Sequence, residues 1–558
     1  MLLLLFLVNF IDGFVVDTSY GKIRGSEIIH DGKLFHSFKK IPYASPPLGN
    51  LRFQKPENPK CWNGILDGTI YGPACLSNST VSHSSPRLMD EDCLHLNVFA
   101  SDFCLKSDES CAVAFYIHGG NLNYDSAVMF DDSTLLKSFA ARDVILVTTQ
   151  FRLGIFSHLI FENQENVPYN IAFFDILQAL DFVHKEIWSF GGDPAKVTLF
   201  GHSFGGAISS LFLFSSEINQ DLSLFQKVIS MSSVANFLPK EILRNLTEEL
   251  VEKAACQSEH DSEVLQCLQK MNALELLRIQ RGMEKNLLTT FWGVIQELPL
   301  FQKGSLADFH KNPKNIPILI GATTKELDDN LDDLPICEIL GYKNEEFIYE
   351  VYKNGSKEKD LKHSDRTQRI FVDTVARVRI LRDKHIPAYL YQYSNPTHPF
   401  HTDDLSYFMG VHNFNKSIDE QKLSEVYPEY FMNFIKFGKP AENWEISNGT
   451  SYFDIDWNEE NGKRPQMRNG FEKEIIDYWF DEMRELDKSI EAQKSVLKYK
   501  SQTFPMPPSN SALLPWFWIL LIFILGLILG KLCFSSSKKS IYVQIPGNNY
   551  NYEKIAEI

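Results

Sequence analysis

The sequence VTLFGHSFGG at residues 197–206 is the most informative stretch of the chain. An apolar, β-branched run leads into Gly-x-Ser-x-Gly, and an apolar helical pattern follows over residues 207–214. A strand, a sharp turn and a helix in this order lift a serine hydroxyl above the end of a sheet. Gly201 and Gly205 let the strand and the helix approach each other without a Cβ clash. We therefore expect Ser203 at the N-terminus of a helix, whose amides can hold negative charge.

A nucleophilic serine needs a base, and the base needs an acid that orients it. The setting of the serine predicts the chain order serine, acid, histidine. Residues 316–321, IPILIG, predict a buried strand, and Glu326 lies on the loop past its end. Residues 388–393, AYLYQY, predict another strand, and the loop after it contains His398 and His401.

A further loop could hold a negatively charged oxygen. Residues 113–117, VAFYI, predict a strand that opens into the sequence HGGN at residues 118–121. A glycine-rich loop of this kind can aim backbone N–H groups at an oxyanion. The amide of Phe204 would be the remaining donor. Apolar strands alternate with helical segments such as residues 173–188, which indicates a mostly parallel sheet covered on both faces.

Together these segments resemble the type-B carboxylesterase and cholinesterase family of α/β-hydrolases, over roughly residues 17–490. The family's N-terminal motif is similar to IPYASPPLGNLRF at residues 41–53. Its two signature segments are similar to EDCLHLN at 91–97 and FGGDP at 190–194. The resemblance implies an α/β-hydrolase fold, with a mostly parallel central sheet flanked by helices.

The resemblance also implies roles for single residues. Gly321 with Glu326 five residues on is similar to the segment that carries the family's acid. HTDDL at residues 401–405 is similar to the segment that carries its histidine, which favours His401 over His398 and His412. Ser203 is then the expected nucleophile, His401 the general acid and base, and Glu326 the residue that orients it.

The oxyanion hole implied by the resemblance consists of the amides of Gly120, Asn121 and Phe204. Three residues here depart from the family. Asn121 stands where a glycine is usual, and asparagine is the side chain that best tolerates a positive φ. Phe204 replaces a small residue, so its ring must lie near the acyl group. His202 stands where the family commonly has Glu.

Composition narrows the function classes. The 558 residues are many for one domain, but α/β-hydrolases with insertions reach this length. The formal charge of −16 argues against nucleic acid and against adsorption to anionic lipid. The histidines and cysteines lack metal-ligand spacing, and nucleotide-binding glycine motifs are missing. We expect no metal and no cofactor.

Secretion is indicated by the N-terminus and by glycosylation sequons. An apolar run over residues 1–8 with Gly13 behind it predicts a signal peptide over residues 1–16, with a buried N-terminal strand as the alternative. The asparagines that begin an N-x-Ser/Thr sequon are Asn78, Asn245, Asn354, Asn415 and Asn448.

The cysteines are consistent with an oxidising compartment, because several can close short loops. Cys75 with Cys93, and Cys256 with Cys267, resemble the family's disulfides. One more bridge is expected among Cys61, Cys104 and Cys111, with Cys104 and Cys111 the favoured pair. Cys337 and Cys533 have no assigned partner.

The C-terminal region predicts a membrane anchor. Residues 501–511 form a polar linker after the domain of residues 17–500, and an uncharged apolar run begins at residue 512. Its length suits one transmembrane helix, assigned to residues 512–534. Lysines follow it, so residues 535–558 are the expected cytoplasmic tail. The domain would face the lumen or the outside, as in a single-pass type I membrane protein. A removed GPI signal is the alternative, and the polar tail argues against it.

The function expected from these features is hydrolysis of small-molecule carboxylic esters through an acyl-enzyme. A neuroligin-like adhesion protein is the first alternative, but proteins of that kind lack a working triad. A cholinesterase is the second, and its branch carries a cation-binding tryptophan in the first disulfide loop. Residues 76–92 contain no Trp, Tyr or Phe, so the aromatic ring expected to bind a quaternary ammonium is missing. The sequence does not identify a protein partner.

Overall fold

The computed structural model describes residues 13–79, 86, 88–162, 167–284, 291, 293–327, 336–359, 361–503, 540–544 and 552–557. The chain divides into two compact units, Met1–Lys488 and Ser489–Ile558. The first unit contains the sheet and the candidate site. The second contains the end of α14 (Met483–Thr503) and an antiparallel pair, β17 (Ser540–Gln544) with β18 (Tyr552–Glu557).

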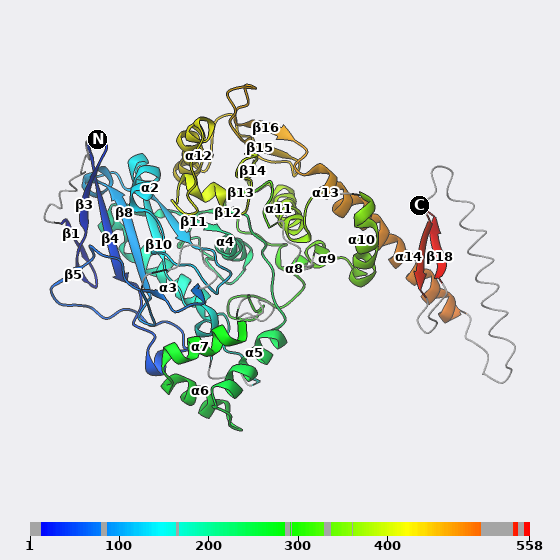
Figure 1. Ribbon diagram of the computed structural model, residues 1–558, viewed down its shortest axis with the longest axis horizontal. Coiled ribbons are helices and arrows are strands. Elements are labelled where there is room, and N and C mark those ends of the chain that lie inside the picture. Colours follow the sequence, from blue (N-terminus) through cyan, green and yellow to red (C-terminus); the bar gives the residue numbers. More distant parts are fainter. Residues whose placement is uncertain are drawn as a thin grey trace. The chain divides into compact units, whose positions relative to one another are not determined.

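An 11-stranded sheet forms the centre of the first unit (Figure 1). Its strands in spatial order are β16 (Gln466–Asn469), β15 (Ser451–Ile455), β14 (Ala388–Tyr393), β13 (Ile318–Thr323), β12 (Lys227–Met231), β11 (Gly192–His202), β9 (Cys111–Ile117), β10 (Val144–Thr149), β8 (His95–Ser101), β4 (Lys33–Pro42) and β3 (Ser26–His30). Every pairing from β15 to β10 is parallel, and the strands outside this run pair antiparallel. The expected mostly parallel sheet is confirmed.

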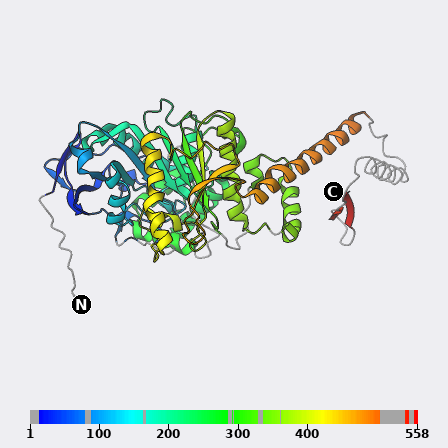
Figure 2. The ribbon, with the colours of Figure 1, turned by 90° about the horizontal axis from the view of Figure 1, so that it is seen from above.

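Helices cover both faces of this sheet (Figures 1 and 2). On one face, Phe200 of β11 packs with Phe431 of α12 (Ile418–Phe437) and with α2 (Asp132–Ser138). Successive strand residues point to opposite faces, so Gly201 faces the other way, toward α4 (Phe204–Phe214). That second face also carries α3 (Ile171–Glu186) and α11 (Asp365–Asp383).

Three amphipathic helices form a separate cluster beside the sheet: α5 (Lys240–Lys253), α6 (Asp261–Lys270) and α7 (Ala273–Met283). In α5 the buried leucines at 243, 246 and 250 recur at helical spacing, as one apolar stripe requires. They pack into a second hydrophobic core with residues of α6 and α7.

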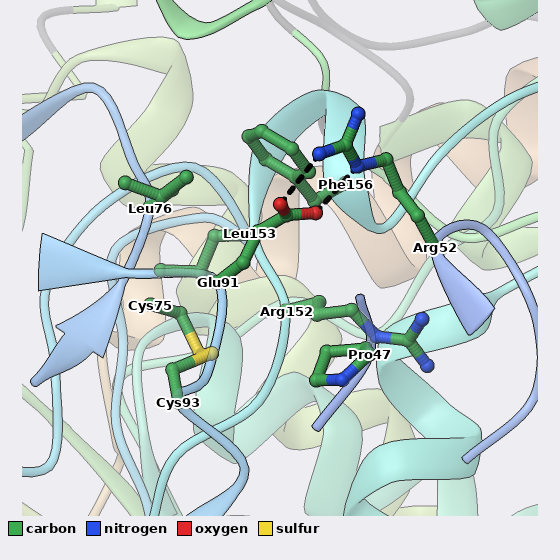
Figure 3. Close-up of a pocket in the computed structure, with 9 residues that line it drawn as sticks. All are labelled: Pro47, Arg52, Cys75, Leu76, Glu91, Cys93, Arg152, Leu153 and Phe156. Atoms are coloured by element: carbon green, nitrogen blue, oxygen red, sulfur yellow. Dashed lines mark hydrogen bonds and ion pairs between the residues drawn. A yellow bond between two sulfur atoms is a disulfide. The ribbon is translucent and has the colours of Figure 1, made fainter. Parts of the chain in front are cut away.

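The motif at residues 41–53 ties the N-terminal region to this helical cluster. Arg52 makes a bidentate ion pair with Glu91, at 2.5 and 2.6 Å, beside the Cys75–Cys93 bridge (Figure 3). Its remaining guanidinium nitrogen donates to the carbonyls of Leu268 and Met271 at the end of α6. The pocket drawn there has a volume of about 10 Å³, which is room for about one water molecule. It is therefore too small for a substrate, and the residues around it serve to hold the two regions together.

The disulfide predictions are confirmed. The bridges Cys75–Cys93, Cys104–Cys111 and Cys256–Cys267 are all formed. Cys61 is exposed and Cys337 is buried, and both are free thiols. Cys533 lies outside the described residues.

The terminal predictions fall mostly outside the described residues. Of the expected signal peptide, residues 15 and 16 belong to β1 (Val15–Thr18), which pairs with β2 (Gly21–Arg24). The expected linker begins at residue 501, whereas α14 continues to Thr503. The proposed span at 512–534 is not described, and within the described ranges no helix has the length and apolar character that a membrane crossing requires.

The sequon asparagines differ in exposure. Those at 245, 354, 415 and 448 are exposed, as attachment of a glycan requires. Asn78 is buried, and its amide nitrogen donates to Glu284 at 2.7 Å. Because the glycan would be attached to that same nitrogen, the folded chain leaves no room for one at Asn78.

Candidate active site

The predicted turn at Ser203 is present between the end of β11 and the start of α4. Ser203 has φ 55° and ψ −125°, a strained conformation for a residue with a side chain. The surrounding glycines are sterically required. A Cβ on Gly201 would lie 2.1 Å from the backbone of Gly205, and one on Gly205 would lie 2.1 Å from the Ile117 carbonyl oxygen.

Three predicted side chains meet in one hydrogen-bonded chain. The Nε2 atom of His401 lies 2.9 Å from Oγ of Ser203, and its Nδ1 atom is bonded to the Glu326 carboxylate. Since a carboxylate only accepts, Nδ1 carries the proton and Nε2 is left to accept from the serine hydroxyl. The loops after β13 and β14 position the acid and the histidine.

The Glu326 carboxylate is buried, and each of its oxygens has a donor. Oε2 accepts from His401, and Oε1 accepts from the backbone N–H of Thr323 at 2.7 Å. The side chain of Glu326 is 0% exposed, whereas that of His401 is 15% exposed. The acid is therefore held in one orientation behind the histidine, and the histidine reaches the cleft.

The expected oxyanion donors line the same cleft as Ser203. Gly120 has φ 83° and Asn121 has φ 55°. Asn121, which stands where the family usually has glycine, therefore adopts the left-handed conformation that glycine favours. The N–H of Phe204 is the first of α4 and has no acceptor within the helix. Within the described residues, none of these three amides donates to a backbone carbonyl.

His118 orients one of these donors. Burial lowers the pKa of His118 to about 4, so its ring is neutral at pH 7, and it stacks on Phe151. Its Nδ1 atom lies 3.0 Å from the Gly119 carbonyl oxygen, to which it donates. In a planar trans peptide the N–H points opposite to the C=O. Holding the Gly119 carbonyl therefore fixes the direction of the Gly120 N–H.

The cleft around Ser203 has a volume of about 490 Å³, within the range of small-molecule sites. Its walls come from the HGGN loop, the serine turn, the start of α11 and the loop after β14. Phe204 lines it, as the sequence led us to expect, and is partly exposed. Arg366 and Arg369 of α11 also line it, and no motif in the sequence pointed to them. In the described part of the chain, no group of three or more His, Cys, Asp or Glu side chains could hold a metal ion.

The sheet order, the strained serine and the Ser–His–Glu chain define an α/β-hydrolase with a serine-dependent site. The model of the carboxylesterase family matches residues 12–479, and the chain belongs to that family.

Similar proteins of mouse and rat are named as a carboxylesterase or as hydrolases. Mouse carboxylesterase 5A is 29% identical over 83% of this chain and 88% of the mouse protein. Rat pyrethroid hydrolase Ces2e is 30% identical over 76% of this chain and 82% of its own. Mouse acylcarnitine hydrolase is 28% identical over 79% of this chain and 85% of its own. A solved PNB esterase superposes with a TM-score of 0.68 at 24% identity, over 83% of this chain and 98% of that one, which shows the shared fold.

Proposed function

We propose that this carboxylesterase hydrolyses small-molecule carboxylic esters through an acyl-enzyme on Ser203. One observation carries the proposal: the continuous hydrogen-bonded chain from Glu326 through His401 to Ser203, at the base of a cleft that three backbone amides also line. It supplies a nucleophile, a base, an orienting acid and oxyanion donors, which are the parts that acyl transfer requires.

Acylation follows from this arrangement. Ser203 Oγ attacks the ester carbonyl carbon while Nε2 of His401 takes the hydroxyl proton. The carbonyl electron pair moves to oxygen, and the amides of Gly120, Asn121 and Phe204 stabilise the negative charge. The buried Glu326 carboxylate stabilises the imidazolium without taking its proton. When the intermediate collapses, the ester C–O bond breaks and His401 protonates the leaving alcohol.

Deacylation repeats the same steps with water. His401 removes a proton from water as its oxygen attacks the acyl carbon, and the same amides hold the second oxyanion. His401 then returns the proton to Ser203 Oγ, which releases the carboxylic acid and restores the resting site.

Active-site labelling tests the assignment of the nucleophile. A fluorophosphonate should modify the wild-type chain once, on the peptide that contains Ser203, and should not modify Ser203→Ala. Ser216→Ala, which removes an exposed serine just past the same helix, should label like wild type. Labelling of Ser203→Ala at an unchanged rate would overturn the assignment.

The membrane topology is part of the proposal. The uncharged run from residue 512 and the lysines behind it support a C-terminal anchor with a cytoplasmic tail. Bridged cysteine pairs and exposed sequon asparagines support a luminal or extracellular domain. Removal of the predicted signal peptide, residues 1–16, would take Val15 and Val16 out of β1.

A further inference from the structure

The residue next to the nucleophile contacts the base. His202 ends β11, immediately before Ser203, and is 2% exposed. Its Nε2 atom lies 2.6 Å from the backbone carbonyl oxygen of His401. The two rings lie side by side, with centroids 4.8 Å apart.

His202 is a neutral donor in this contact. A carbonyl oxygen only accepts, so Nε2 of His202 carries the proton. Burial lowers the pKa of His202 well below its ordinary value, and the neighbouring His401 and His412 lower that pKa further. The ring therefore stays uncharged through the neutral pH range. Other ionisable groups in or against the His401 loop include Glu326, Asp403, Asp404 and His398, which is paired with Glu420.

The main chain of His401 is held on both sides. Its N–H donates to the carbonyl oxygen of Glu326 at 3.2 Å, and its C=O accepts from His202. The first bond joins the histidine to the loop of the acid. The second joins it to the strand that carries the nucleophile. Because His202 and Ser203 are consecutive, the second bond limits how far the imidazole can move away from Oγ.

We propose that His202 is a positioning residue for ester hydrolysis, which rests on the catalytic roles proposed above. It holds the backbone of His401 so that Nε2 stays within hydrogen-bonding distance of the Ser203 hydroxyl. It does this without charge, so it neither repels nor stabilises the imidazolium that His401 becomes in each transition state.

Uncharged substitutions of His202 that differ in side-chain length test its contact with the His401 carbonyl in the full-length protein. His202→Gln keeps an uncharged N–H donor of similar reach, His202→Asn keeps the amide but shortens it, and His202→Leu removes the donor. Small misplacements of catalytic groups cost up to about 100-fold, so we expect kcat for p-nitrophenyl butyrate to fall roughly 10- to 100-fold in the Leu and Asn variants. KM should stay within about twofold, and His202→Gln should recover most of kcat, since it restores the bond.

The matched control is His158→Leu. His158 is also buried, lies away from the cleft, and neither of its ring nitrogens has a hydrogen-bond partner among the described residues. Its substitution should leave kcat unchanged. If His202→Leu fails to fold, the comparison of Gln with Asn decides. Wild-type kcat in the Asn or Leu variant, or a Gln variant as slow as Asn, would overturn the proposal.

The pH dependence of kcat/KM gives a second test, because general destabilisation of the fold would not shift it. His202→Glu places a carboxylate beside His401, and the negative charge favours the imidazolium over the neutral ring. The acid limb of kcat/KM should then move to higher pH than in wild type, whereas His202→Gln should leave it in place. An unmoved limb in the Glu variant would contradict the contact. Activity that survives Ser203→Ala would instead refute the underlying catalytic assignment.

Discussion

At the scale of single residues, the proposed catalytic side chains could be found in the sequence because each lies at a recognisable distance past a predicted strand. Ser203, Glu326 and His401 each follow a predicted strand, and parallel strands bring their carboxyl ends to one edge of a sheet. His202 and His118 could not be assigned their contacts in this way. Each donates to a backbone carbonyl, and the acceptor of His202 lies 199 residues away, so no pattern of side chains records the bond.

The ring of Phe204 is predicted to limit the size of the acyl group. Phe204→Ala keeps the backbone N–H proposed for the oxyanion hole and removes a bulky side chain from the wall of the cleft. The ratio of kcat/KM for butyrate over acetate esters should therefore rise, because a hydrophobic pocket discriminates by fit. The measurement is that ratio in both proteins. An unchanged or lower ratio would mean that the ring points away from the substrate.

At the scale of elements, the parallel strands that hold the site were predictable because each contains a run of mostly apolar residues. The predicted strand at residues 388–393 coincides with β14, and the one predicted at 316–321 is β13, Ile318–Thr323. The short antiparallel edge strand β16 and the cluster α5–α7 were not predicted. Their exposed faces are polar, so tertiary packing decides their structure more than local sequence does.

A buried ion pair ties α11 to the wall of the cleft. The guanidinium of Arg377 lies 2.8 Å from Asp373, donates to the Ser233 carbonyl at 2.7 Å, and has no exposed surface. Asp373 in turn accepts from the Ala235 N–H at 3.1 Å. These bonds hold the segment after β12, whose residues 232–234 and 236 line the cleft.

Removing one partner of this pair should be costly. Arg377→Met should lower the free energy of unfolding by about 3–5 kcal/mol, because it strands a buried carboxylate. The double variant Arg377→Met with Asp373→Leu should lose less free energy of unfolding than Arg377→Met alone. Arg382 lies on the same helix, and its side chain is 43% exposed. Arg382→Met should therefore lower the free energy of unfolding by at most about 1 kcal/mol. Urea unfolding measures all three. A double variant that loses more than Arg377→Met would contradict the account.

At the scale of the whole molecule, buried neutral histidines make stability depend on pH. Burial lowers the pKa of His158 and of His310 to about 3. In the unfolded chain these rings regain an ordinary pKa near 6.5, so the unfolded state binds more protons from pH 6.5 down to the folded pKa. Their contribution to stability is therefore complete above pH 6.5 and is lost as the pH falls toward 3.

The predicted consequence is a difference between variants. The thermal unfolding midpoint of wild type should fall more steeply between pH 7 and pH 5 than that of His158→Leu, which has one fewer ring to protonate. Comparing two chains cancels the carboxylates that titrate in the same range. Parallel curves for the two proteins would show that His158 does not titrate on unfolding.

Anchoring is predicted to depend on the C-terminal segment alone. A chain that ends at residue 511 keeps the whole family match and loses the uncharged apolar run. It should be secreted, should shift in mass on treatment with an N-glycosidase, and should retain the kcat/KM of the full-length protein. Retention of the shortened chain in membranes after a carbonate wash would argue for another attachment.

Ser203, His401 and Glu326 are expected to act as one catalytic unit. The most direct test is kcat/KM for p-nitrophenyl butyrate in Ser203→Ala, in His401→Ala and in the double variant. Each single substitution should remove activity by about 10⁴- to 10⁶-fold, and the double variant should be hardly worse, since losses within a unit do not add. A Ser203→Ala protein that keeps most of its activity and is still inhibited by organophosphates would contradict the account.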